Sequence, residues 1–388
     1  MCTSGRECKP AYASCTSPRP WQLVLSPRTR RPAILRFLRR FPLSLCPCFV
    51  SVRSCGGGPR WLGLANSITY AGSFGVDLFF VLSAYLITEL LLREQTRCGT
   101  LDVRAFYIRR ILRIWPLYFF CIALALVPAL NPFHGFSWRY VAAFLLLAGN
   151  WSIVAWGWPI HTIVSPLWTV SIEEQFYLLW PPIVRRLGGK RIILAAIAML
   201  ILSALVRVLL VAIHAGPNSV RCNTVARLDP IAAGILLAAL LRGRMPKLRV
   251  VYRLAMLCAG IAALSLIANY WRTNDPESLQ WVPTLAGFPL VAASCTVIMI
   301  AVLGFSFHLP RWLVYLGKIS YGLYVYHALG MVVADKLMPS HTHFRQLMLR
   351  ETIALAATVS LASASYALLE KPFLRIKKRF QLIGSRPV

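Results

Sequence analysis

Long apolar runs, separated by short polar and basic loops, recur along most of this chain. A helix needs about 20 predominantly apolar residues to cross the hydrocarbon core of a bilayer. Eight runs approach that length, at 74–92, 111–130, 167–184, 192–213, 251–270, 282–304, 319–335 and 352–369, and a shorter run at 231–241 is a ninth candidate. The pattern predicts an all-α integral membrane protein, a bundle of about nine transmembrane helices.

Clusters of Lys and Arg orient these runs, because basic loops stay on the cytoplasmic side of a membrane. Four clusters lie at 104–113, 185–191, 242–249 and 375–379. All four face the cytoplasm only if segment 140–158, too short to cross twice, lies along the membrane or dips back into it. Nine crossings then leave the C-terminal tail inside and the Arg-rich N-terminal segment outside. One more helix before residue 74 would bring that segment to the cytoplasmic side.

The composition agrees with a membrane protein. Of the 388 residues, 57% are hydrophobic and 14% are charged, and the mean hydropathy of +0.62 lies above the usual range of soluble domains. The formal net charge of +29 could indicate a nucleic-acid binder, but the basic residues lie in short loops and form no basic domain. We therefore expect the lipid bilayer as a partner, and no nucleic acid.

Three parts of the chain differ in composition. Residues 1–65 are rich in Arg, Pro and Cys and hold six of the eleven cysteines, so we expect a disordered segment or a mis-called start. Residues 66–373 carry the membrane runs, and residues 374–388 form a basic cytoplasmic tail. The cysteine and histidine spacings are not those of a metal site, so no metal is expected.

Two adjacent acids stand out in the stretch PLWTVSIEEQFYLLWP. Ser171 and Glu174 have the spacing of a capping box, so Glu174 is interpreted as a helix cap. Glu173 can be a first-turn acid that compensates the helix dipole. A second carboxylate beside an apolar run is costly without a partner, however, and this favours a functional role. The predicted topology puts Glu173 near the outer face, where it would bind or deprotonate a hydroxyl.

Arg110 and Arg113 are three residues apart and are predicted to share one helix face at the cytoplasmic end of a span. The guanidinium group binds phosphate or diphosphate through its fork of donors. The alternative is positive-inside anchoring, and this motif alone does not separate the two.

His327 lies with three tyrosines in an otherwise apolar span, in the sequence ISYGLYVYH. An ionisable residue within a membrane is a functional candidate, and imidazole suits proton transfer. A structural hydrogen bond to a neighbouring helix is the alternative. Asp77 is a further polar candidate near the start of a span, whereas Arg227 and Asp229 are interpreted as an ion pair at a helix start.

Five motifs, in this order, resemble those of the acyltransferase-3 family of polytopic membrane O-acyltransferases. They are GVDLFFVLSAYLI, FYIRRILRIWPLYF, LWTVSIEEQFYLLWP, ISYGLYVYH and the terminal EKPF, between about residues 72 and 373. The resemblance implies a ten-helix membrane domain that moves an acyl group, usually acetyl, from cytoplasmic acyl-CoA to a hydroxyl of an extracytoplasmic glycan or related acceptor. The family's arginine motif corresponds to Arg110 and Arg113, its glutamate to Glu173, and its tyrosine-histidine motif to Tyr324 and His327.

One departure from the family pattern is expected to matter. The family's first helix carries a basic residue and, about three turns later, a His regarded as the catalytic base. In this chain no His occurs before His134. Either the first helix has been lost from this reading frame, or the chain as written is inactive.

The residues and the resemblance together predict a multi-pass O-acyltransferase of the inner (plasma) membrane. Its catalytic residues would be Glu173 and His327, its donor site Arg110 and Arg113, and its acceptor site Tyr324 and Asp77. Acyl-CoA is expected as the donor substrate with no bound cofactor, and a glycan or lipid-linked sugar as the acceptor. The alternatives are a catalytically inactive truncated member and a membrane transporter of sugar-like solutes, although the sequence has no internal repeat to favour transport.

Overall fold

The protein is helical throughout the part that its structure, a computed structural model, describes. This part comprises residues 72–127, 137–159, 163–271, 273, 279–305, 310–338 and 344–380. The prediction of an all-α fold is confirmed for these residues. The predicted N-terminal segment 1–65 and the last eight residues of the basic tail lie outside them.

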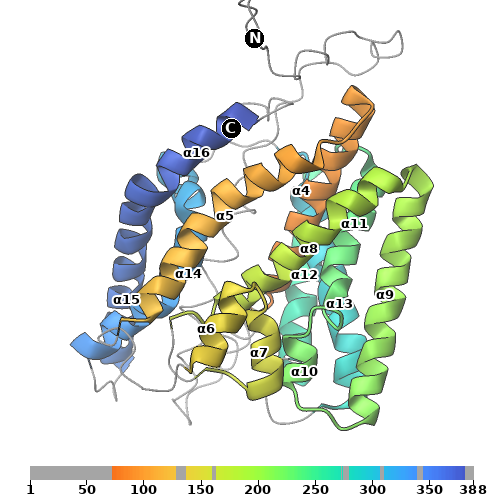
Figure 1. Ribbon diagram of the computed structural model, residues 1–388. Coiled ribbons are helices and arrows are strands. Elements are labelled where there is room, and N and C mark those ends of the chain that lie inside the picture. The colour runs from red at the N-terminus through yellow and green to blue at the C-terminus, as the bar shows by residue number, and fades with distance from the viewer. Residues whose placement is uncertain are drawn as a thin grey trace, which may run out of the picture.

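Nine longer helices run up and down the bundle in the described part of the chain (Figure 1). They are α4 Gly75–Cys98, α5 Val103–Ala125, α8 Leu167–Arg186, α9 Gly189–Ala212, α11 Leu228–Leu241, α12 Val250–Tyr270, α13 Phe288–Val302, α14 Arg311–Leu337 and α15 Phe344–Ser365. Each overlaps one predicted apolar run. Five stretches are long and apolar enough to cross a membrane, at Gly75–Cys98, Gly189–Ala212, Val250–Tyr270, Pro283–Val302 and Arg345–Lys377. The count of nine crossings stays a prediction.

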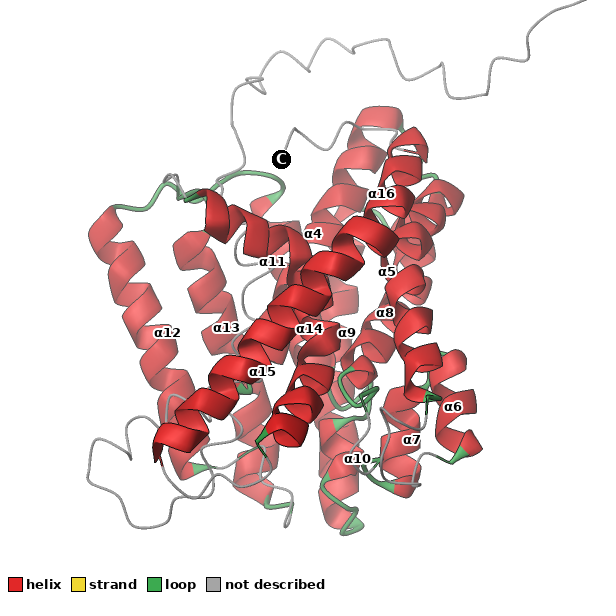
Figure 2. Cartoon of the chain, turned by 90° about the vertical axis from the view of Figure 1, so that its left-hand side faces the viewer, coloured by secondary structure: helices red, strands yellow, loops and turns green. Residues whose placement is uncertain are grey.

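Short helices complete the bundle. The π-helix η4 Pro283–Gly287 leads into α13, and α10 Asn218–Arg221 lies between α9 and α11. At the C-terminal end, α15 continues through the π-helix η5 Tyr366–Glu370 into α16 Lys371–Lys377 and the short η6 Lys378–Phe380. In Figure 2, α15 and α16 run obliquely across α14.

Segment 140–158 folds into two short helices, α6 Trp138–Leu145 and α7 Gly149–Trp156. Eight residues give a helix of about 12 Å, whereas the bilayer core is about 30 Å thick. Neither helix can cross alone. A side chain at Gly149 would overlap the Phe144 ring, so glycine allows the close turn between the two helices. This geometry agrees with the prediction that the segment makes no single crossing.

Helix α5 begins eight residues before the start of the apolar run that predicted it. The Asp102 side chain caps it by accepting a hydrogen bond from the Ala105 N–H at 2.8 Å. The arginines at 104–113 form the first three turns of this helix, so Arg110 and Arg113 lie on one helix, as their spacing predicted. Arg109 is buried there, where its Nη2 donates to Glu94 Oε2 of α4 at 3.2 Å and its Nη1 to the Phe380 carbonyl at 3.0 Å.

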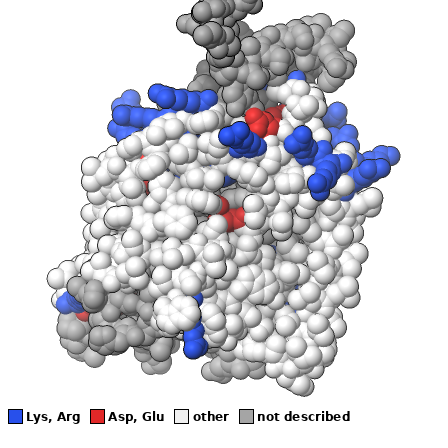
Figure 3. Space-filling model, viewed as in Figure 1, with Lys and Arg blue, Asp and Glu red and all other residues white. Residues whose placement is uncertain are grey.

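The basic side chains and the apolar core are distributed differently in the bundle. On the face shown in Figure 3, most Lys and Arg side chains gather at the end of the bundle near α16. The apolar interior consists mainly of two clusters, one around α4, α5, α8 and α14 and one around α4, α11, α12 and α13. Helix α4 contributes buried residues to both clusters, so it packs between them.

Candidate active site

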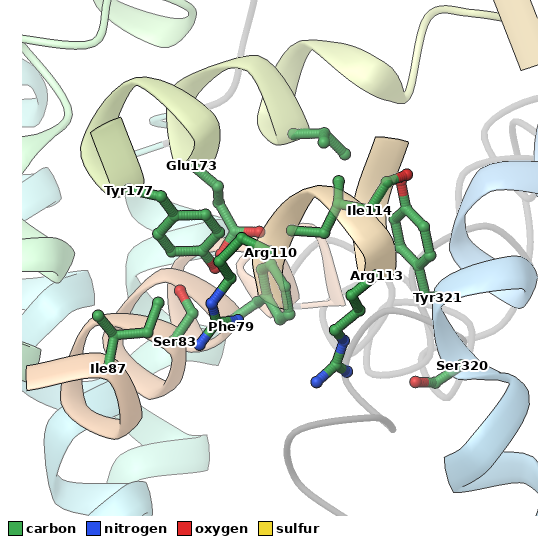
Figure 4. Close-up of a pocket in the computed structure, with 11 residues that line it drawn as sticks. Phe79, Ser83, Ile87, Arg110, Arg113, Ile114, Glu173, Tyr177, Ser320 and Tyr321 are labelled. Carbon is green, nitrogen blue, oxygen red and sulfur yellow. The ribbon is translucent and has the colours of Figure 1, made fainter. Parts of the chain in front are cut away.

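A pocket opens between four helices that are distant in the sequence. It is lined by Phe79, Ser83 and Ile87 of α4, Arg110, Arg113 and Ile114 of α5, Val170, Glu173 and Tyr177 of α8, and Ser320 and Tyr321 of α14 (Figure 4). The pocket is the place where the predicted arginine motif and the predicted functional acid meet.

Arg110 and Arg113 reach the pocket from the same side of α5, as their spacing of three residues predicted (Figure 4). The Arg110 guanidinium lies over the Tyr177 ring, 5.0 Å from its centroid, and over the Phe106 ring at 5.3 Å. These cation–π contacts hold the Arg110 side chain against α8. Two guanidinium groups in one pocket form a site with the chemistry to bind an anion such as a phosphate.

Glu173 is only 4% exposed and faces the same pocket. Ser83, Tyr177 and Arg110 line the pocket beside its carboxylate, and Arg110 interacts with it electrostatically. Its Oε1 has no hydrogen-bond partner in the described structure. The prediction separated Glu173, near the outer face, from arginines at the cytoplasmic end. The structure corrects this, because the early start of α5 carries the arginines into the bundle.

Glu174 does not cap the helix, so the predicted capping box is wrong. Helix α8 begins at Leu167, five residues before the start that a cap at Ser171 would give, and Ser171 lies inside it with its hydroxyl donating to the Leu167 carbonyl at 3.2 Å. Glu174 Oε2 instead accepts a hydrogen bond from Trp115 Nε1 of α5 at 3.0 Å. The two neighbouring acids therefore differ in their surroundings: Glu173 faces the pocket and Glu174 joins two helices.

Tyr324 and His327 lie further along α14 and do not line this pocket. The Tyr324 hydroxyl is buried between Thr169 Oγ1, at 2.6 Å, and the Pro166 carbonyl, at 2.9 Å, so it fastens α14 to the start of α8. His327 Nδ1 faces the Tyr324 carbonyl. A carbonyl only accepts, so Nδ1 must carry the proton, and Nε2 is left as the basic nitrogen. His327 is six residues from Tyr321, about 9 Å along the helix axis.

Asp77 also lies outside the pocket. Its carboxylate pairs with Arg227 Nη2 at 2.9 Å, and both side chains are buried. The predicted pairing of Arg227 with Asp229 is wrong, because Asp229 binds Arg207 of α9, whose Nη2 donates to Asp229 Oδ1 at 3.0 Å. The sequence could not indicate these partners, since α4 and α9 are far from residue 227 along the chain. Among the residues that the structure describes, no group of acids, His and Cys could hold a metal ion.

Sequence reasoning missed three polar groups of the pocket, Ser83, Tyr177 and Ser320. Tyr177 follows Glu173 by four residues, a spacing that places both on one helix face, so this signal was present in the sequence. Ser83 had no such signal, because only the packing of α4 against α8 brings it to Glu173.

Comparison with known proteins shows the family to which the chain belongs. The family model for the acyltransferase domain matches residues 50–367, which is most of the chain. The chain belongs to the acyltransferase-3 family. The O-acetyltransferase OatA of Staphylococcus aureus (strain NCTC 8325 / PS 47) is 29% identical over 346 residues, covering 81% of this chain and 54% of the relative. The OatA of strain MRSA252 matches equally.

The chain spans about half the length of these curated relatives of the acyltransferase-3 family, 54% in each case. No solved structure matches the chain. The apolar helices and the family together make it a membrane protein.

Proposed function

We propose that this protein is a multi-pass O-acyltransferase of the inner (plasma) membrane. It would move an acyl group, usually acetyl, from cytoplasmic acyl-CoA to a hydroxyl of an extracytoplasmic glycan or lipid-linked sugar. Membership of the acyltransferase-3 family and the name of the Staphylococcus aureus relatives support this reaction class. Acyl-CoA is a substrate in this proposal, and no bound cofactor takes part.

The donor would enter from the basic end of the bundle. That end carries most Lys and Arg side chains of the face in Figure 3, so the positive-inside rule assigns it to the cytoplasm, with nine helices crossing the bilayer. Arg110 and Arg113 would hold the donor's phosphate groups through bidentate hydrogen bonds. The single observation that carries the proposal is that these two arginines and Glu173 line one pocket.

The chemistry follows from placing a thioester in this pocket. The acceptor hydroxyl oxygen attacks the thioester carbonyl, the new C–O ester bond forms, the C–S bond breaks, and the CoA thiolate leaves. Glu173 would accept the hydroxyl proton, since it lines the pocket and its Oε1 has no hydrogen-bond partner in the described structure. We propose that Tyr324 and His327 act toward the outer end, where His327 Nε2 can take up a proton.

Donor binding tests the role of the arginines. Arg113→Ala should weaken CoA binding to the purified protein by about tenfold or more, because it removes charge-assisted hydrogen bonds worth about 1.5–3 kcal/mol. Arg113→Lys should recover only part of the affinity, since a lysine lacks the bidentate fork. The measurement is a titration with CoA in detergent micelles.

Arg104 supplies a matched control for this experiment. It lies on the same helix but is exposed and does not line the pocket, so Arg104→Ala should leave CoA affinity within about twofold. Equal CoA affinity in the Arg113→Ala variant and the unsubstituted chain would contradict the donor site and favour positive-inside anchoring as the role of the arginines. CoA binding without any release of thiol from acetyl-CoA would support the non-catalytic alternative.

A further inference from the structure

Helix α4 presents two different faces to its neighbours. Phe79, Ser83 and Ile87 follow one another at intervals of four residues and line the pocket. Asp77 precedes Phe79 by two residues, and two residues turn a helix by about 200°. Asp77 therefore lies on roughly the opposite side of α4 from the pocket wall.

The face that carries Asp77 packs against α11 more closely than a side chain would allow. A Cβ at Gly234 would overlap the Val81 carbonyl oxygen and come within 2.9 Å of the Tyr85 nitrogen. Gly234 follows Arg227 by seven residues, which is about two turns, so both lie on the same side of the α11 segment. The Asp77–Arg227 ion pair and the Gly234 contact thus fix α4 on α11 at two levels.

The Asp77–Arg227 ion pair is buried, and its contact is short. Asp77 and Arg227 are 2% and 3% exposed, and their 2.9 Å contact lies beside Phe288, whose ring centroid is 4.9 Å from the Arg227 guanidinium carbon. A charge of this kind within a membrane bundle is costly without a partner, so the pair holds the two segments in one register.

We infer that Asp77 and Arg227 are positioning residues that fix the rotation of α4, so that Ser83 and Phe79 face Glu173 across the pocket. This inference rests on the proposed function, and it replaces the predicted contact between Asp77 and the acceptor. Small displacements of a positioned group can cost catalysis up to about a hundredfold. The Asp77–Arg227 pair would thus affect the rate of acyl transfer although it lies outside the pocket.

The test neutralises the pair with Asp77→Asn and Arg227→Gln together, which leaves no single buried charge. With a glycan present as the hydroxyl acceptor, release of CoA thiol from acetyl-CoA should fall about tenfold or more per folded molecule. The matched control is Arg207→Gln with Asp229→Asn, which neutralises the neighbouring pair between α9 and α11, neither of which lines the pocket. The control should lower thermal stability but leave the rate per folded molecule within about threefold, because the Arg207–Asp229 pair joins α9 to α11 and does not hold α4.

A second readout does not depend on activity. In each background, Ser83→Cys and Glu173→Cys are joined by a short bifunctional thiol reagent, and the cross-linked peptides are identified by mass spectrometry. Cross-linking should survive in the control and be lost when the α4 pair is neutralised. Unchanged turnover and cross-linking in the Asp77 and Arg227 variant, or an equal loss in both variants, would overturn the inference. If the unsubstituted chain releases no thiol when a glycan acceptor is present, the proposed function fails, while the cross-link still decides the positioning role.

Discussion

Glu174 contacts a different helix from the one that carries it, and its carboxylate holds α8 to α5 through Trp115. The hydrogen bond is partly buried and joins a neutral donor to a carboxylate, a class worth about 1.5–3 kcal/mol. Glu173, one position earlier, has no such link to Trp115. At the scale of single residues, the two acids therefore divide into one that holds helices together and one that faces the pocket.

Substitutions of Trp115 and Glu174 should show separately what the hydrogen-bond donor and the hydrogen-bond acceptor contribute to stability. Trp115→Phe should lower the apparent Tm in detergent, because it leaves the buried Glu174 oxygen without its donor. Glu174→Gln keeps an acceptor oxygen for Trp115, so its effect on stability should stay within about 1 kcal/mol. Trp151→Phe is the matched control, since its indole makes a longer bond of 3.4 Å to Gln175 in an exposed position. A larger Tm loss for Trp151→Phe than for Trp115→Phe would contradict this account.

Part of the site could be predicted from residue spacing alone. Arg110 and Arg113 were expected on one face, and the high cost of an unpartnered acid marked Glu173 for function. The capping box failed because a four-residue motif does not show where the helix begins, and the observed cap position is Pro166, five residues before Ser171. The partners of Asp77, Arg227 and Asp229 come from distant helices, which no local pattern reveals.

At the scale of elements, Arg253 of α12 links two helices at the basic end. Its guanidinium donates to the Ala301 and Leu303 carbonyls at the end of α13, at 2.7 Å each, and to the Pro246 carbonyl at 2.7 Å. The last carbonyls of a helix lack partners within the helix and favour a cation. Arg253 thus acts as a C-terminal cap supplied by a neighbouring helix.

Removal of this cap should destabilise the bundle. Arg253→Met leaves several buried carbonyls without donors, and we expect a loss of about 2–3 kcal/mol in the free energy of unfolding, seen as a lower apparent Tm in detergent. Arg253→Lys should recover part of it. Arg249→Met, at an exposed position just before the same helix, should change stability by about 0.5 kcal/mol or less. Equal Tm values for Arg253→Met and Arg249→Met would rule out the cap.

At the scale of the whole molecule, hydropathy located the nine longer helices of the described part but underestimated the length of some of them. Helices α5 and α14 both begin at least eight residues before their apolar runs, at Val103 and Arg311. Arginine is a good helix former although it ends an apolar run, so a helix extends beyond its hydrophobic signal. The central position of α4 depends on its packing against other helices, which the hydropathy of the sequence does not predict.

The central claim is that Glu173 and the two arginines form one catalytic pocket. The most direct measurement is the release of CoA thiol from acetyl-CoA by the protein in proteoliposomes that also contain a glycan as the hydroxyl acceptor, compared between Glu173→Gln and Glu174→Gln. These two variants make the same chemical change at adjacent positions. Glu173→Gln should lower the rate by about 10²–10⁴-fold while CoA still binds, and Glu174→Gln should stay within a few-fold of the unsubstituted chain. A Glu173→Gln variant that keeps full activity, or a greater loss in Glu174→Gln, would contradict the account.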